Sequence, residues 1–394
     1  MNLTKYRSIQ LPIPLSIIPT TLLCFSIPCL GTSAITIFSI IPVVLWFFTF
    51  KYNSYFETLK TYPFTFISLL LFLYLGLSLL WSEHFLDGIS ILKKYREFVF
   101  LPIFLIYFSN PQCRKYGLIA LYAGMVITLF ISYLVYYGII TSPPRQHSLG
   151  NRIFNGILLS FFAYWSLSLS LEYKKYKLPL ICLFILSFFC IFNIRDGQTG
   201  QVLLIALSFL FMYQNWKWKG FFKTLVFLIP FSYYFLLYTS QGESLIVSAN
   251  NLSAGSLDIS SLAKFDIRLE YYINTLRIFM NHWLFGVGIG DFPSAYLSIQ
   301  TTHEHFWEPT QNAHNEFLMI ASQTGIFGLT LFLLFFTSLF KNTFHLTPNR
   351  SKIAIAALIT VAISCTFNSS FLDNNDGVLL MILIALFSVH PTLP

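Results

Sequence analysis

The segment His314–Phe340, HNEFLMIASQTGIFGLTLFLLFFTSLF, decides the class of fold. Its main part, Phe317–Phe340, carries no ionisable side chain and has the length of a helix that crosses a hydrocarbon core about 30 Å thick. Three polar residues, His314, Asn315 and Glu316, stand directly before it. Imidazole and carboxylate groups lose solvation at a membrane edge unless they find partners or a substrate, so we interpret this junction as a candidate site.

The apolar character of this segment extends along the whole chain. Hydrophobic residues make up 56% of the 394 residues, charged residues make up 10%, and the mean hydropathy is +0.67. A soluble globule of this size needs more polar surface, so we predict an all-α polytopic integral membrane protein. Recurring apolar stretches of roughly 17 to 25 residues predict about twelve transmembrane helices. Their expected bounds are Leu11–Leu30, Ala34–Phe50, Tyr62–Trp81, Phe98–Phe108, Tyr116–Ile140, Ile153–Leu171, Leu178–Ile194, Gln201–Tyr213, Phe221–Tyr238, Phe317–Phe340, Ile353–Phe371 and Val378–Val389.

Two of these stretches, Phe98–Phe108 and Gln201–Tyr213, are short for a span and are also compatible with re-entrant segments. The distribution of basic residues predicts the orientation. With both termini in the cytoplasm, 15 of the 24 basic residues fall inside, together with only two of the 16 acidic residues, Glu57 and Glu172. The net charge of +8 is therefore mainly an orientation signal, and we do not expect nucleic-acid binding.

The predicted helices divide the chain into three parts. Residues 1–238 hold the first nine transmembrane helices, residues 239–313 form one large outside loop, and residues 314–394 hold the last three helices. Loops of this length often carry function. Within the loop, Phe265–Trp283 has apolar positions at helical spacing and predicts an amphipathic helix at the membrane surface. We predict a second outside amphipathic helix at Ser82–Glu97.

Two motifs in the loop resemble ligand-binding sequences but fit them poorly. The run Phe285–Phe292, FGVGIGDF, has three alternate glycines, yet it lacks the spacing and the βαβ context of a dinucleotide site, and we interpret it as a close turn. His303 and His305 flank one glutamate, but this spacing is neither that of a zinc-binding helix nor that of a carboxylate pair. We therefore expect no bound metal and no nucleotide.

Several basic residues remain outside despite the orientation bias, which makes them candidates for binding an anion. Arg195 lies in a polar turn, NIRDGQTG, where a guanidinium and backbone N–H groups can hold an anion; anchoring at the interface beside Asp196 is the structural alternative. Lys93, Lys94 and Arg96 end the second amphipathic segment, and attraction to anionic lipid explains them equally well.

Two further side chains have competing interpretations. Arg268 can form an ion pair with Asp266 or Glu270, or bind a phosphate in a bidentate manner. A structural histidine is the simpler interpretation of His314 taken alone. Its neighbours Asn315 and Glu316 favour a functional one, because they can orient the ring at the junction between loop and helix.

Three patches, taken in order, resemble the O-antigen ligase and polymerase superfamily of bacterial envelope enzymes. They are the polar turn around Arg195, the loop segment RLEYYINTLRIF that begins at Arg268 together with the glycine turn, and HNEFL at 314–318 followed by GIFG at 325–328. The likeness covers about residues 93–328. Many relatives have a serine- or threonine-flanked arginine where this chain has Arg195-Asp196, which leaves the role of Asp196 open. We interpret Gly325 and Gly328 as small residues that let the helix pack closely.

The resemblance implies an enzyme of the bacterial inner membrane with a periplasmic active site. In this superfamily a glycan carried on undecaprenyl pyrophosphate is moved to an acceptor hydroxyl without nucleotide sugar or metal. By resemblance, His314 is the general base, and Arg195 and Arg268 stabilise the pyrophosphate leaving group. The residues that we expect to bind substrate are Lys93, Lys94, Arg96, Arg152, Tyr272, Asn315 and Glu316.

The number of outside loops favours one activity within the superfamily. Polymerases, whose acceptor is a second lipid-linked glycan, commonly have two sizeable periplasmic loops. This chain has one, which favours a ligase that uses the lipid A–core oligosaccharide as acceptor. A protein-glycosylating oligosaccharyltransferase is a third alternative. A lipid-linked glycan transporter or flippase is the non-enzymatic alternative; it predicts charges at span midpoints and internal repeats, and the sequence shows neither.

Overall fold

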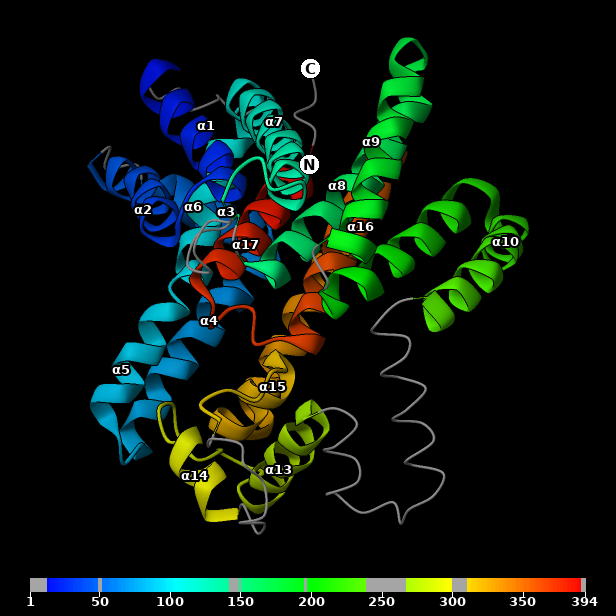
Figure 1. The fold of residues 1–394 in the computed structure, drawn as a ribbon. Coiled ribbons are helices and arrows are strands. Elements are labelled where there is room, and N and C mark those ends of the chain that lie inside the picture. Colours follow the sequence, from blue (N-terminus) through cyan, green and yellow to red (C-terminus); the bar gives the residue numbers. More distant parts are fainter. Residues whose placement is uncertain are drawn as a thin grey trace.

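The computed structural model describes residues 13–48, 52–141, 149, 151–194, 197–238, 267–299 and 310–390, with the backbone alone at 13–15, 221 and 223–238. These residues fold mainly into helices (Figure 1). The helices are α1 (Ile13–Cys29), α2 (Thr32–Phe48), α3 (Tyr52–Thr61), α4 (Pro63–Leu77), α5 (Phe85–Lys94), α6 (Glu97–Ser109), α7 (Pro111–Tyr136), α8 (Arg152–Glu172), α9 (Lys177–Phe189), α10 (Gln198–Tyr238), α13 (Ile267–Asn281), α14 (Phe292–Ile299), α15 (Glu316–Thr343), α16 (Pro348–Phe367) and α17 (Asn374–Ser388). A π-helix, Cys190–Ile194, extends α9.

Each of the twelve predicted spans overlaps one of these helices, which confirms the helical fold of the described residues. Two of them, Gln201–Tyr213 and Phe221–Tyr238, lie in α10, which bends at Lys217. Among the described residues, six helices are long and apolar enough to cross a membrane, or seven if α2 and α3 form one bent span. Twelve crossings, and the side of the membrane on which each loop lies, stay predictions.

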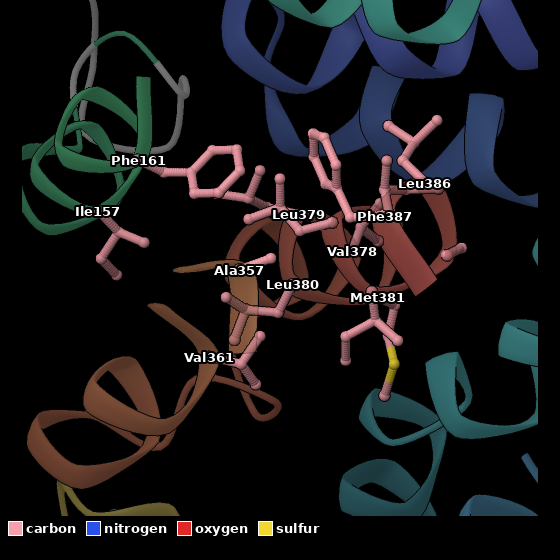
Figure 2. Close-up of a cluster of buried hydrophobic side chains, with 14 of the residues drawn as sticks. Ile157, Phe161, Ala357, Val361, Val378, Leu379, Leu380, Met381, Leu386 and Phe387 are labelled. Carbon is pink, nitrogen blue, oxygen red and sulfur yellow. The ribbon is translucent and has the colours of Figure 1, made fainter. Parts of the chain in front are cut away.

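The centre of the bundle is occupied by α17. Every residue from Asn375 to Ser388 is buried, so this helix is enclosed by protein around its whole circumference. Figure 2 shows its side chains against Ile157 and Phe161 of α8 and against Ala357 and Val361 of α16. Burial of this kind explains how α6 and α17 can be shorter than a lipid-exposed span, because neighbouring helices cover their ends.

A smaller hydrophobic core holds the described part of the predicted outside loop against the start of α15. It consists of buried side chains from α13, α14 and the α15 segment: Ile278, Phe292, Tyr296, Ala313 and Met319. The helix predicted at Phe265–Trp283 is confirmed as α13, and the one predicted at Ser82–Glu97 is confirmed as α5. Figure 1 shows α5, α13 and α14 at the same end of the molecule as the first turns of α15.

The glycine run between α13 and α14 is a close turn, as predicted. Gly286, Gly288 and Gly290 all have positive φ, and a Cβ at any of them would collide with neighbouring backbone. Its backbone N–H groups are used inside the protein: Val287 and Gly288 donate to the carbonyls of Ser322 and Gln323, both at 2.9 Å. They are therefore turned into the fold and do not form a phosphate cradle.

The same turn enters a break in α15. Gly325 has φ +66° and interrupts the helix, and the Ile326 N–H donates to the Trp283 carbonyl at 2.8 Å. A Cβ at Gly325 would collide with the Leu284 carbonyl, so the predicted close approach at this residue is confirmed, with a loop backbone as the neighbour. A Cβ at Gly328 would meet Thr324 of its own segment, and the structure gives it no such close neighbour from another helix.

Candidate functional site

His314 occupies the turn that leads into α15. Its φ of +50° lies in the left-handed region, which costs a residue other than glycine of order 1–3 kcal/mol unless its surroundings hold it there. The surroundings do so here: the His314 N–H donates to Asn312 Oδ1 at 2.7 Å, and the Asn312 N–H donates to the Thr310 hydroxyl at 3.1 Å. Backbone strain maintained by a local network is typical of functional positions.

Helix α13 holds His314 through two consecutive tyrosines. The His314 ring stacks on Tyr271, with 5.3 Å between ring centroids and 21° between planes. The Tyr272 hydroxyl lies 3.2 Å from the His314 carbonyl and 3.3 Å from the Thr366 carbonyl at the end of α16. Burial, together with the Glu270 carboxylate, raises the pKa of Tyr271, so the ring that faces the imidazole is an uncharged phenol at neutral pH. The imidazole is thereby fixed in position on one face.

Arg268 lies on the same helix, one turn before these tyrosines. Residues three and four apart on a helix are neighbours on its surface, so Arg268 shares a face of α13 with Tyr271 and Tyr272. Its side chain is partly exposed. The structure thus brings the predicted arginine and histidine to one corner of the fold, although 46 positions separate them in the sequence.

Arg195 and Asp196 fall outside the described residues. The segment that follows them is described, and it joins the same corner through α16. The Thr199 hydroxyl accepts a hydrogen bond of 3.2 Å from Asn368, two residues beyond Thr366, whose carbonyl lies within reach of Tyr272. Gly200 packs against Gly156 so closely that a Cβ on either residue would crowd the other's backbone. The start of α10 is therefore anchored to α8 and to the end of α16.

Asn315 and Glu316, which the sequence analysis expected to orient the His314 ring, have other hydrogen-bond partners. Asn315 Oδ1 accepts the Leu318 N–H at 3.0 Å and caps α15. Glu316 is fully buried, and its two oxygens accept from the Tyr95 hydroxyl at 2.7 Å and from the Phe371 N–H at 2.9 Å. These hydrogen bonds of Asn315 and Glu316 are made with groups other than the His314 ring. Glu316 instead ties α15 to the α5–α6 junction and to the loop before α17, which gives it a positioning role.

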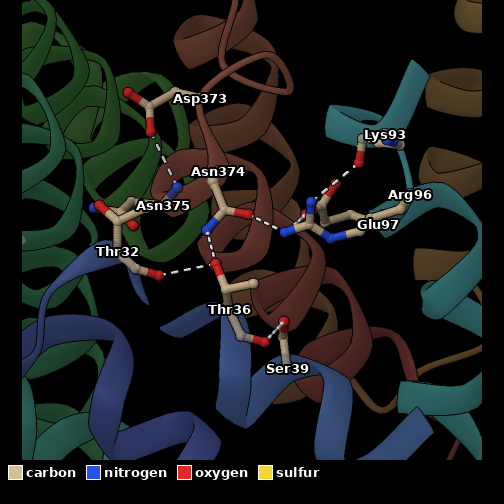
Figure 3. Close-up of polar contacts among 9 residues, drawn as sticks. All are labelled: Thr32, Thr36, Ser39, Lys93, Arg96, Glu97, Asp373, Asn374 and Asn375. Atoms are coloured by element: carbon tan, nitrogen blue, oxygen red, sulfur yellow. Dashed lines mark hydrogen bonds and ion pairs between the residues drawn. The ribbon is translucent and has the colours of Figure 1, made fainter. Parts of the chain in front are cut away.

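The basic residues expected to bind substrate differ in their surroundings. Lys93 and Lys94 end α5 and are exposed, and Arg152 is exposed at the start of α8. Arg96 is engaged within the protein: Figure 3 shows its guanidinium bonded to Asn374 and to the Lys93 carbonyl and facing Glu97, whose carboxylate lies 3.5 Å away. Arg96 therefore connects α6 to α17.

The polar start of α17 was missed by the sequence analysis. Asn374 donates to Thr36 of α2 at 2.8 Å and accepts from Arg96, and Asp373 caps the helix at the Asn375 N–H. Asn375 and Asp376 are buried, each with one side-chain oxygen that has no hydrogen-bond partner among the described residues. The signal was present in the sequence: the run Asp373–Asp376, DNND, interrupts an otherwise apolar C-terminal region.

Tyr271 is the second missed residue. It precedes the predicted Tyr272, and its position three residues after Arg268 placed it on the same helical face. The part of the chain that the structure describes contains no group of three or more His, Cys, Asp or Glu side chains able to hold a metal. His303 and His305 lie outside that part.

Residues 181–333 match the family model described as O-antigen ligase. This part of the chain is therefore similar to the O-antigen ligase family, in agreement with the resemblance drawn from the sequence. The matched segment contains α13, α14, the candidate base His314 and both candidate arginines. A comparison with curated proteins gave no significant match. The apolar helices indicate a membrane protein, and the matched segment is similar to a family of glycan-transferring enzymes.

Proposed function

We propose that this protein is a member of the O-antigen ligase superfamily and transfers O-antigen polysaccharide from undecaprenyl pyrophosphate to a sugar hydroxyl of the lipid A–core oligosaccharide, at the periplasmic face of the inner membrane. The family match supports the general chemistry. The single large loop expected between residues 239 and 313 favours a ligase over a polymerase.

In the proposed reaction the acceptor hydroxyl oxygen attacks the anomeric carbon of the donor glycan. His314 accepts the proton of that hydroxyl, a role worth typically 10²–10⁴-fold in rate. The bond between the anomeric carbon and the pyrophosphate oxygen breaks, and undecaprenyl pyrophosphate leaves with the electron pair. Arg268 and Arg195 compensate the negative charge that grows on the leaving group. No metal takes part in this scheme.

One geometric observation supports the proposal most strongly. Arg268 lies on the same face of α13 as Tyr271 and Tyr272, and these two tyrosines contact His314. A base and a phosphate-binding cation are useful to each other only when both are fixed relative to one substrate. The hydrogen bonds from Tyr272 towards Thr366 and from Asn368 to Thr199 support the further proposal that the turn containing Arg195 faces the same substrate. The apolar helices nearby suit the polyprenyl chain of the donor.

The remaining substrate contacts are part of the same proposal. Lys93 and Lys94 are exposed cations at the end of α5, and Arg152 is an exposed cation at the start of α8. We assign them to the phosphates or acidic sugars of donor and acceptor. Asn315, Glu316 and Arg96 act by holding helix ends in place, as their contacts in the protein indicate.

The lipopolysaccharide of a deletion strain separates the candidate activities. A ligase predicts a lipid A–core without O-antigen, while full-length polymer stays on the carrier lipid. A core capped by a single repeat would indicate a polymerase instead. Unchanged lipopolysaccharide with loss of a glycoprotein would indicate a protein glycosyltransferase. Transfer by the purified protein from lipid-linked glycan to lipid A–core, without any other enzyme, tests the ligase against a transporter.

A further inference from the structure

A cluster of positive charge lies at the end of the bundle opposite His314. Helix α16 spans the distance between the two places, from Arg350 in its first turn to Thr366 near its end, whose carbonyl lies beside Tyr272. His345 follows the last turn of α15. Four other segments contribute: Arg114 in the first turn of α7, Arg350 in the first turn of α16, His390 after α17, and Tyr62 directly before α4. We call these five residues the basic cluster. None of them belongs to the candidate active site, and all five lie outside the family-matched segment.

Hydrogen bonds and ring contacts fix the geometry of the basic cluster. The His390 N–H lies 3.2 Å from the Tyr62 hydroxyl, and the two rings are 4.8 Å apart between centroids. His345 lies 5.6 Å from His390, again between ring centroids. Asn342 donates through Nδ2 to the Ser388 carbonyl at 2.8 Å, so its Oδ1 accepts from His390 Nε2 at 2.7 Å. The imidazole of His390 is thus held as a donor at Nε2.

The charges in the basic cluster are mutually repulsive. Arg350 is close enough to Arg114 for their like charges to interact, and both arginines act on the Tyr62 hydroxyl. Burial lowers the pKa of His390, and the positive charges of His345 and Arg350 lower it further. No carboxylate of the described residues forms an ion pair with any of these groups. Like charges gathered at a half-buried position disfavour folding unless a counter-ion joins them.

One donor in the cluster is directly unsatisfied. Arg114 Nη1 is buried and has no hydrogen-bond partner among the described residues. A guanidinium N–H removed from water and left without an acceptor is costly, and it points to an acceptor supplied from outside the chain. The first turns of α7 and α16 add the positive ends of two helix dipoles at the same place, because Arg114 and Arg350 both lie there. Planar guanidinium groups match phosphate oxygens in a bidentate manner.

We propose that the basic cluster binds a phosphate group at the membrane surface opposite the active site, with Arg114 and Arg350 as its main ligands and His345, His390 and Tyr62 around it. The phosphodiester of an anionic phospholipid has the right chemistry and is present at high local concentration at that depth. Free phosphate offers the same oxygens. The site is independent of glycan transfer and would tie α7, α16 and the end of α15 together when occupied.

The test measures the thermal unfolding temperature of the purified full-length protein in detergent with added phosphatidylglycerol, phosphatidylcholine or inorganic phosphate. The variants are Arg114→Gln and Arg350→Gln. Lys115→Gln is the matched control, because Lys115 is the next residue on α7, carries the same charge and is exposed. The wild type and Lys115→Gln should be stabilised by phosphatidylglycerol and not by phosphatidylcholine. Both arginine variants should lose at least half of that increase.

Lipid-free samples distinguish ligand binding from a structural role. Removing one of two repelling cations should leave the lipid-free unfolding temperature of Arg114→Gln equal to or above that of the wild type, whereas an arginine that only supports the fold predicts a decrease. Stabilisation by inorganic phosphate as strong as by phosphatidylglycerol would identify free phosphate as the source. Equal phosphatidylglycerol shifts in the wild type and in both arginine variants would overturn the site. None of these measurements depends on whether the protein is a ligase.

Discussion

The imidazole of His314 lies flat against the ring of Tyr271, at 5.3 Å and 21°. The two residues come from segments separated by 43 positions, and the contact joins the helix that bears Arg268 to the helix that begins after the proposed base. A general base must sit within hydrogen-bonding distance of the proton that it removes, so the orientation of this ring limits the reaction geometry. Tyr271 is therefore a positioning residue.

Tyr271→Phe should keep most of the transfer activity, because the aromatic face remains. Tyr271→Leu should reduce kcat about 10-fold or more through misplacement of the imidazole. The measurement is glycan transfer by purified protein, with kcat and KM determined separately. Tyr271→Phe is the control: it keeps the aromatic ring and removes the hydroxyl. Its activity would fall as well if the hydroxyl, and not the ring, were the group that matters. Equal activity of the leucine variant and the wild type would contradict the positioning role.

His314→Asn separates the chemical role of this residue from its backbone role. Asparagine tolerates positive φ better than other residues with a Cβ, so the turn should persist, while transfer should fall about 10²–10⁴-fold with the loss of the base. His314→Ala should lose activity to the same extent and also lower the unfolding temperature, because alanine is strained at φ +50°. Wild-type activity in the asparagine variant would end the general-base proposal.

Arg268→Lys tests whether the guanidinium fork matters beyond its charge. If Arg268 binds pyrophosphate in a bidentate manner, the lysine variant should be nearly as impaired as Arg268→Ala, by about 10²- to 10³-fold in kcat. Arg277→Lys is the control, since Arg277 is exposed on the same helix and donates to Asn274 Oδ1 within that helix. Arg195→Lys should behave like Arg268→Lys. Full activity in either lysine variant would argue against the fork.

The helices were predictable because apolar runs and helical spacing are local properties of the sequence. All twelve expected stretches overlap helices, and α5 and α13 were expected from their amphipathic patterns. The break at Gly325 was not predictable, because it depends on a loop backbone from Trp283 to Gly288 that enters the helix from elsewhere. The complete burial of α17 was also hidden, since a lipid-facing helix and a protein-enclosed helix have the same composition.

The sequence was sufficient to select the residues of the candidate site, but it did not predict which side chains contact one another. His314 and Arg268 were selected by residue type and resemblance, and the structure brings their segments together. Glu316 looked like a partner of the histidine because it is adjacent in the sequence. Its carboxylate points instead to Tyr95 and Phe371, residues 221 and 55 positions away, and sequence proximity carries no information about such pairing.

Gly325→Ala should destabilise the protein far more than Gly138→Ala. Both glycines have similar positive φ, +66° and +70°, but a Cβ at Gly138 meets nothing within 4 Å, whereas at Gly325 it collides with the Leu284 carbonyl. The change at Gly138 should cost about 1 kcal/mol from backbone strain alone. The change at Gly325 should cost more than this, because the new Cβ also displaces the turn before α14. It should reduce glycan transfer as well. Thermal unfolding of both variants measures the difference, and similar unfolding temperatures would contradict the packing argument.

The contact between His84 and Asp291 predicts a pH-dependent contribution to stability. Asp291 accepts hydrogen bonds from the backbone N–H groups of Glu83 and His84 and from His84 Nδ1 at 2.7 Å, which joins the start of α5 to the turn before α14. The hydrogen bond to Asp291 is the main cause that raises the pKa of His84 above its ordinary value of 6.5, and the nearby carboxylates add to it. The folded protein therefore binds this proton more tightly than the unfolded chain does.

A raised pKa in the folded state makes the stabilising contribution of His84 complete below about pH 6.5 and removes it as the pH rises through the folded-state value. The unfolding temperature of the wild type should therefore fall relative to that of His84→Asn as the pH increases from 5.5 to 8.5. His282→Asn is the control for replacing an exposed histidine by asparagine, because His282 is exposed just after α13. If the wild type and His84→Asn differ by the same amount at every pH, the ion pair with Asp291 contributes nothing to stability, and the two neutral backbone hydrogen bonds alone hold the turn against α5.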